Sequence, residues 1–286
     1  MKRLKKIINE LKISTDIKHE DAPNLIREFI FYSPKIPLRL HQEQLLTSSK
    51  QFKLNVTDTY FTGGELIINC FSWGNGKIKI LLTHGWASKA ADFFELIIEL
   101  QKIEDVEIIA FDAPGNGSSE SDFSNLMLYA ESVKSITANH AVPDFIIGHS
   151  LGGMANVIAI QEAEINPKLL ISIAPLIRLK ENFEQSMDLV NISVSAKENF
   201  FKNFNAEFPV NVDYFNLTEL YKLNGKINHF LAYDKEDHIS PYVYLTEFLD
   251  KHRSVISKAY KDAGHYKILK STEVMADVIA NIKLAI

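Results

Sequence analysis

The chain has 286 residues, of which 46% are hydrophobic and 23% charged, and its formal net charge is −5 at pH 7. This composition is ordinary for a globular protein with a sizeable core, and the negative charge argues against nucleic acid as a partner. The single cysteine, Cys70, excludes an intrachain disulfide and a metal site built on several thiolates. No apolar stretch approaches the roughly 20 residues that span a bilayer, and the basic N-terminal stretch lacks the apolar core of a signal peptide. We therefore expect a cytoplasmic protein without stable membrane insertion.

Residues 1–51 are polar and favour helix, and we expect Pro23, Pro34 and Pro37 to break this stretch into short pieces. We interpret this stretch as an N-terminal helical extension. Two strand-like runs follow, over residues 52–56 and 66–71. The glycines between them, Gly63 and Gly64, predict a hairpin.

From residue 77 onward, apolar runs alternate with amphipathic stretches. The apolar runs predict strands over residues 78–83, 106–111, 169–174, 227–233 and 255–260, and one more directly before Ser150. Helical spacing predicts helices over residues 92–101, 125–139, 242–251 and 272–284, and one more directly after Ser150. This alternation predicts an α/β fold with a mostly parallel central sheet flanked by helices.

The alternation is interrupted over residues 176–226, which we interpret as a small helical cap, or lid, inserted into a core of residues 52–175 and 227–286. This insertion is rich in aromatic residues, which either line an apolar pocket or pack against the core. They are Phe183, Phe200, Phe201, Phe204, Phe208, Tyr214, Phe215 and Tyr221.

The hexapeptide at residues 148–153, GHSLGG, stands where a strand gives way to a helix. A sharp strand-to-helix turn strains its central residue and leaves no room for side chains two positions away on either side. Gly148 and Gly152 meet that need and would expose the hydroxyl of Ser150 at the turn.

The active sites of open parallel sheets form at the carboxyl ends of the strands. The segments that follow the expected strands are rich in polar residues: His84-Gly85-Trp86, residues 112–119, Ser150, residues 234–241 and residues 262–265. Along the chain, these segments contain first a serine, then an acid and then a histidine.

This ordered set of motifs resembles the α/β-hydrolase superfamily. Within it, the HGW and DAPGNGSS segments are similar to bacterial hydrolases of esterase type. Those relatives more often have a histidine where Asn116 stands, a departure that the chemistry of the reaction does not explain.

The resemblance implies a serine hydrolase with Ser150 as the nucleophile, His265 as its general base and Asp237 as the acid that orients the imidazole. The backbone N–H groups of Leu151 and Trp86 would form the oxyanion hole. No cofactor or metal is required.

Each assignment has a structural alternative. Asp234 is the alternative to Asp237 as the acid. We prefer Asp237 because Pro241 follows it four residues later, the spacing usual in the α/β-hydrolase superfamily. We expect His84 and Asp112 to hold loops and His149 to pack beside the nucleophile turn.

We expect the enzyme to cleave a carboxylic ester or thioester of a small, partly apolar substrate through an acyl-enzyme on Ser150. Two alternatives remain open. An acyltransferase would use the same triad, and a non-enzymatic binder or sensor would keep the fold and the pocket. The sequence does not specify the oligomeric state.

Overall fold

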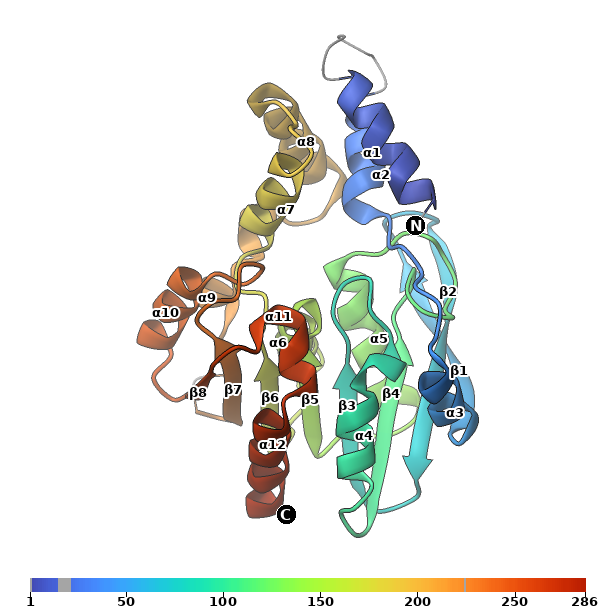
Figure 1. Ribbon diagram of the computed structural model, residues 1–286, viewed down its shortest axis with the longest axis vertical. Coiled ribbons are helices and arrows are strands. Elements are labelled where there is room, and N and C mark those ends of the chain that lie inside the picture. The colour runs from blue at the N-terminus through green and yellow to red at the C-terminus, as the bar shows by residue number, and fades with distance from the viewer. Residues whose placement is uncertain (1, 15–21, 224) are drawn as a thin grey trace.

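The computed structural model describes residues 2–14, 22–223 and 225–286. Its centre is an eight-stranded sheet in the order β1-β2-β4-β3-β5-β6-β7-β8 (Figure 1). The strands are β1 (Lys50–Asp58), β2 (Gly64–Gly74), β3 (Ile78–Thr83), β4 (Val106–Asp112), β5 (Phe145–His149), β6 (Leu169–Ile173), β7 (Asn228–Asp234) and β8 (Ile256–Tyr260). The expected strands are therefore all present.

The strand pairs are antiparallel at the β1 edge of the sheet and parallel elsewhere. β1 and β2 form the expected antiparallel hairpin, and β2 also runs antiparallel to β4. Every other pair in the sheet is parallel. The prediction of a mostly parallel α/β sheet is confirmed.

Helices cover both faces of this sheet, because successive strand residues point to opposite sides. On β3, Ile80 and Leu82 join one core while Leu81 joins the other. The helices of one face are α4 (Phe94–Leu100) and α12 (Thr272–Ala285), in front of the sheet in Figure 1; those of the other are α5 (Leu126–Asn139) and α6 (Leu151–Glu162). Among residues 2–14, 22–223 and 225–286, no helix combines the length and apolar character that crossing a membrane requires.

Among the residues described before the sheet, the helices are α1 (Lys2–Ser14), α2 (Ala22–Phe31) and α3 (Leu40–Thr47). Pro23 stands at a helix boundary, as expected. Pro23 lies in the first turn of α2, where its missing N–H costs no intrahelical hydrogen bond. Pro34 and Pro37 lie in the extended stretch between α2 and α3, as expected.

Between β6 and β7 the chain forms α7 (Leu179–Asp188), α8 (Val194–Glu207), the short η2 (Val212–Tyr214) and α9 (Leu217–Leu220). α2 packs against α8, and both stand beyond the edge of the sheet where α11 (Gly264–Lys267) lies (Figure 1). The remaining helical elements are η1 (Ala90–Phe93), α10 (Tyr242–Lys251) and η3 (Ile268–Lys270). The division of the chain into extension, core and cap stays a prediction.

Candidate active site

Ser150 occupies the turn between β5 and α6 in a strained conformation, with φ 53° and ψ −122°. A positive φ is rare for a residue with a side chain and persists only where the surroundings enforce it. Here backbone hydrogen bonds on both sides hold the turn, since Ser150 N–H donates to Ile173 O and Ser150 O accepts from the N–H groups of Gly153 and Leu176.

The two glycines that flank Ser150 are required by close contacts. A Cβ on Gly148 would lie 2.5 Å from Asn156 Nδ2 and 2.7 Å from Gly152 O. A Cβ on Gly152 would lie 2.3 Å from Thr83 O, at the end of the neighbouring strand β3. Gly148 thus faces the other arm of the turn, as the sequence predicts, whereas Gly152 is constrained by β3.

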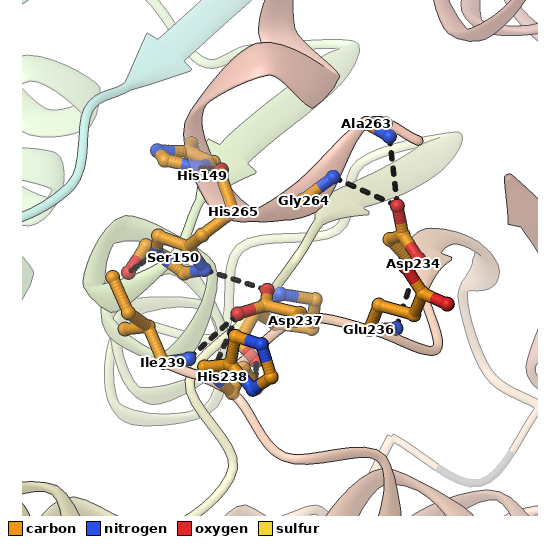
Figure 2. Close-up of polar contacts among 12 residues, drawn as sticks. His149, Ser150, Asp234, Glu236, Asp237, His238, Ile239, Ala263, Gly264 and His265 are labelled. Carbon is orange, nitrogen blue, oxygen red and sulfur yellow. Dashed lines mark hydrogen bonds and ion pairs between the residues drawn. The ribbon is translucent and has the colours of Figure 1, made fainter. Parts of the chain in front are cut away.

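The structure brings Ser150, His265 and Asp237 into one hydrogen-bonded chain (Figure 2). His265 Nε2 lies 2.8 Å from Ser150 Oγ, and His265 Nδ1 lies 2.7 Å from Asp237 Oδ2. All three residues are buried, with 5–7% of their surface exposed. Because Asp237 accepts at Nδ1, the lone pair of Nε2 is available to the serine hydroxyl.

The two candidate acids have different partners (Figure 2). The other oxygen of Asp237, Oδ1, accepts hydrogen bonds from the N–H groups of Ile239 and Ser240, which fix the carboxylate toward the imidazole. Asp234 does not reach the ring. Its Oδ2 accepts from the N–H groups of Ala263 and Gly264, directly before His265.

Asp234 therefore holds the loop that carries His265. Burial raises the pKa of Asp234, but hydrogen bonds from the backbone N–H groups of Glu236, Gly264 and Ala263 outweigh burial and lower it below the usual value. Asp234 is thus kept as a carboxylate, the form that accepts these bonds.

His149 lies beside the turn, as expected. Its Nε2 donates to the backbone carbonyl of His265 at 2.8 Å, and the two rings are 4.9 Å apart. Burial and the neighbouring His265 lower the pKa of His149 to about 3. His149 is therefore neutral near pH 7 and supports the position of His265.

His84 and Asp112 hold loops, as the sequence predicts. His84 Nε2 accepts from the N–H of Ala113, which leaves Nδ1 to donate to Gly85 O at 2.7 Å. Asp112 accepts from the N–H groups of Ala90 and Ser118. Burial lowers the pKa of His84, so that its ring is neutral.

The two segments expected to supply the oxyanion hole, at Leu151 and at Trp86, both lie close to Ser150. Leu151 is the first residue of α6, where N–H groups have no intrahelical acceptor. Trp86 follows β3 and lines the same cavity as Ser150. A Cβ on the intervening Gly85 would lie 3.0 Å from Ser150 Cβ, so this loop closely approaches the nucleophile.

Ser150 and His265 open into a cavity of about 880 Å³ whose lining is mostly apolar. Of the eight aromatic residues singled out between residues 176 and 226, Phe183 lines this cavity. The packing alternative holds for Phe200, Phe204, Phe208, Phe215 and Tyr221, which are buried in the core. Within the described part of the chain, no group of three or more His, Cys, Asp or Glu side chains could hold a metal ion.

The family model described as serine aminopeptidase, S33, matches residues 74–237, which include the nucleophile turn and Asp237. The chain belongs to this family. It is thereby a hydrolase of the α/β-hydrolase superfamily, as the motifs in its sequence indicate.

Individual relatives of this hydrolase match it at low sequence identity or over only part of the chain. Monoglyceride lipase of Rattus norvegicus is 31% identical over 121 residues, 38% of this chain and 39% of the lipase, so the match spans well under half of that protein. An esterase of Pyrococcus furiosus superposes with a TM-score of 0.61 at 19% identity, covering 88% of this chain and 96% of the esterase. A thermophilic esterase of Thermogutta terrifontis gives 0.58 at 15% identity, covering 82% and 99%. These structures show a shared fold.

Two features of this hydrolase were not predicted from its sequence. The short helix α11, on which His265 lies, was not expected, because four residues carry no periodic signal. Residues 29–42, outside the expected core, line the cavity beside Ser150. The one sequence signal for the second feature was Asn116, whose partner is in that stretch.

Proposed function

We propose that this chain is a serine hydrolase that cleaves a carboxylic ester or thioester through an acyl-enzyme on Ser150. The observation that carries the proposal is the hydrogen-bonded chain from Ser150 Oγ through His265 to Asp237. Ser150 sits at the head of this chain and opens into the cavity. A serine hydroxyl is a weak nucleophile until a positioned base takes its proton, and this arrangement supplies the base.

In the first half-reaction, His265 Nε2 removes the proton from Ser150 Oγ as that oxygen attacks the carbonyl carbon of the substrate. The carbonyl oxygen becomes an oxyanion, to which the N–H groups of Leu151 and Trp86 donate. His265 then protonates the leaving alkoxide or thiolate, the bond to the leaving group breaks, and the acyl group stays on Ser150. Asp237 stabilises the imidazolium throughout.

In the second half-reaction, His265 removes a proton from water, which attacks the acyl carbon. The new oxyanion collapses, His265 returns the proton to Ser150 Oγ, and the carboxylic acid is released. The mostly apolar cavity suits a small, partly apolar substrate. The names of the rat monoglyceride lipase and the Pyrococcus esterase support ester bonds as the target.

The test is turnover of p-nitrophenyl butyrate by the wild-type chain and by Ser150→Ala. We expect the wild type to release p-nitrophenol and Ser150→Ala to have lost that activity. Equal turnover by both proteins would remove Ser150 from the mechanism. If the wild type does not turn over the ester but binds butyrate in the cavity, the result would favour the alternative of a non-enzymatic binder.

Repeating the assay with an added alcohol separates hydrolysis from transfer. A hydrolase yields mainly butyric acid, whereas an acyltransferase yields mainly the new ester, because its acyl-enzyme excludes water. The cytoplasmic location, the small-molecule partner and the absence of a required cofactor stay predictions from the sequence.

A further inference from the structure

The stretch of residues 29–42, here called the N-terminal wall, lines the same cavity as Ser150 and His265. Its apolar contributions include Phe31, Pro34 and Ile36. These side chains offer no hydrogen bond to a ligand. A wall of this kind discriminates between substrates by size and apolar area.

Backbone hydrogen bonds dock the N-terminal wall onto the loop after β4. The N–H of Ser33 donates to Asp122 O at 3.0 Å, and Phe31 O accepts from the N–H of Ser124 at 2.9 Å. Tyr32 and Phe123 form an isolated antiparallel bridge between the two segments. The N-terminal wall is thus held in a fixed position against the loop that leaves the sheet after β4.

A buried side-chain bond completes this docking and gives Asn116 a role. Ser33 Oγ donates to Asn116 Oδ1 at 2.6 Å, and both residues are 1% exposed. Asn116 Nδ2 in turn donates to Pro114 O at 3.0 Å. The residue that departs from the esterase-like pattern therefore connects the N-terminal wall to the carboxyl end of β4.

The N-terminal wall also meets α7 and α8. The Phe31 ring packs edge-on against Phe183 of α7, with centroids 6.1 Å apart, and both residues line the cavity. Phe31 also packs against Phe208, after α8, at 5.7 Å, and Arg27 of α2 forms an ion pair with Glu207 of α8. The cavity is therefore bounded by α7 and by the N-terminal wall together.

We propose that the N-terminal wall determines the size of the apolar group that the substrate carries. Ile36 acts as a specificity-determining residue, and the pair Ser33 and Asn116 acts as positioning residues that hold the wall in place. This inference rests on the proposed ester hydrolysis, since the cavity is the one that opens at Ser150.

The first test compares kcat/KM for p-nitrophenyl acetate, butyrate, octanoate and decanoate. Ile36→Trp should lower the ratio of decanoate to acetate by about tenfold, the effect of one or a few misfitted methylenes, and Ile36→Ala should change it severalfold in the opposite direction. The control is Leu40→Ala. Leu40 belongs to the same stretch, as the first residue of α3, but it is 70% exposed and does not line the cavity, so the ratio for Leu40→Ala should stay within about twofold of the wild-type ratio. Unchanged ratios in both Ile36 variants would overturn the proposal.

The second test addresses the anchor with Ser33→Ala, Asn116→Ala and the double variant. We expect each single variant to raise KM for decanoate severalfold with kcat for acetate unchanged. The double variant should add nothing to the effect of Asn116→Ala, because Asn116→Ala already removes the bond to Ser33 together with the bond to Pro114 O. The control is Ser132→Ala, which removes a buried serine hydroxyl bonded to Leu128 O, away from the cavity. An equal change in Ser132→Ala, or an effect on acetate alone, would contradict a positioning role.

The third test separates this proposal from the proposed function. In the Ser150→Ala background, binding of butanoate and decanoate is measured by calorimetry with and without Ile36→Trp. Ile36→Trp should weaken decanoate about tenfold and leave butanoate within about twofold. If the wild type cleaves no ester but this difference appears, the proposed function fails and the wall stands. If esters are cleaved and neither the ratios nor these affinities respond, the wall proposal fails alone.

Discussion

The triad of Ser150, Asp237 and His265, here called the strand-end site, borders the same cavity as the N-terminal wall. The two regions are held in place by different forces. Ser150, Asp237 and His265 are fixed by hydrogen bonds, including those that Asp237 and Asp234 accept from backbone N–H groups. The N-terminal wall is docked by a few hydrogen bonds, but its contact with α7 and α8 is a cluster of phenylalanine rings around Phe31.

This difference indicates that the two regions control separate properties. Hydrogen bonds fix both the distance and the direction between two groups, which proton transfer requires. Apolar packing fixes volume, which selects substrates by size. Changes at the strand-end site should therefore affect every substrate alike, while changes in or behind the wall should affect stability and the ranking of substrates.

The largest expected effect is that of Ser150→Ala. Loss of the nucleophile should lower kcat by about a millionfold for p-nitrophenyl acetate and octanoate alike. The free energy of unfolding should change little or rise, because alanine removes one hydroxyl from a strained turn. Urea titration followed by circular dichroism provides the control that the variant is folded. A loss confined to the longer ester would mean that Ser150 controls substrate ranking, as the N-terminal wall does, and would contradict separate roles for the two regions.

The next effect distinguishes the two carboxylates. Asp237→Asn should lower kcat by about 10⁴-fold, because an amide cannot hold the imidazole in the required tautomer or stabilise its charge. Asp234→Asn serves as the matched control and should cost roughly tenfold, since Asp234 acts through the loop before His265. Steady-state kinetics with one ester measures both. The reverse order would make Asp234 the acid.

The sequence predicted the strand-end site well because its signals are local. Ser150 directly follows β5, while Asp237 and His265 lie in the segments after β7 and β8, and the parallel topology brings these strand ends to one edge. The order of the strands in the sheet could not be predicted in this way. β4 lies between β2 and β3, and no local pattern specifies which strands become neighbours.

The N-terminal wall could not be predicted for a related reason. The contact between Phe31 and Phe208 joins segments that are far apart in the sequence, and an aromatic residue at a helical position indicates burial without naming its partner. For the same reason the aromatic residues of α7 and α8 gave two interpretations. Phe183 lines the cavity, and Phe204 packs behind it.

A smaller effect is expected behind the wall. Phe204 is 4% exposed and stacks on Phe208 with centroids 4.1 Å apart, so Phe204→Ala should lower the free energy of unfolding by about 3–5 kcal/mol. Phe201→Ala, on the same helix but half-buried, should cost about 1 kcal/mol. Denaturant titration measures both. Similar values would show that the cluster around Phe31 is not tightly packed.

The smallest effect is a dependence of stability on pH at the strand-end site. The pKa of His149 is about 3 in the folded chain, against about 6.5 for an ordinary histidine. Between these values the unfolded chain binds the additional proton, so the free energy of unfolding falls as the pH drops below 6.5. The contribution at pH 5 is about 2 kcal/mol.

The measurement is the change in the free energy of unfolding between pH 7 and pH 5 in wild type and in His149→Gln. Glutamine does not titrate, so the variant should show a smaller change. An equally steep dependence in both proteins would mean that His149 is not held neutral beside His265.

Covalent trapping of the nucleophile tests whether Ser150 is the hydroxyl that His265 activates. The wild-type chain is treated with a fluorophosphonate at neutral pH, digested, and analysed by mass spectrometry, with Ser150→Ala as the control. We expect one phosphonylated residue, Ser150, and no adduct in Ser150→Ala, because in the described part of the chain it is the Ser150 hydroxyl that is bonded to His265 Nε2, at the head of the chain to Asp237. An adduct on another residue, or equal labelling of Ser150→Ala, would contradict this expectation.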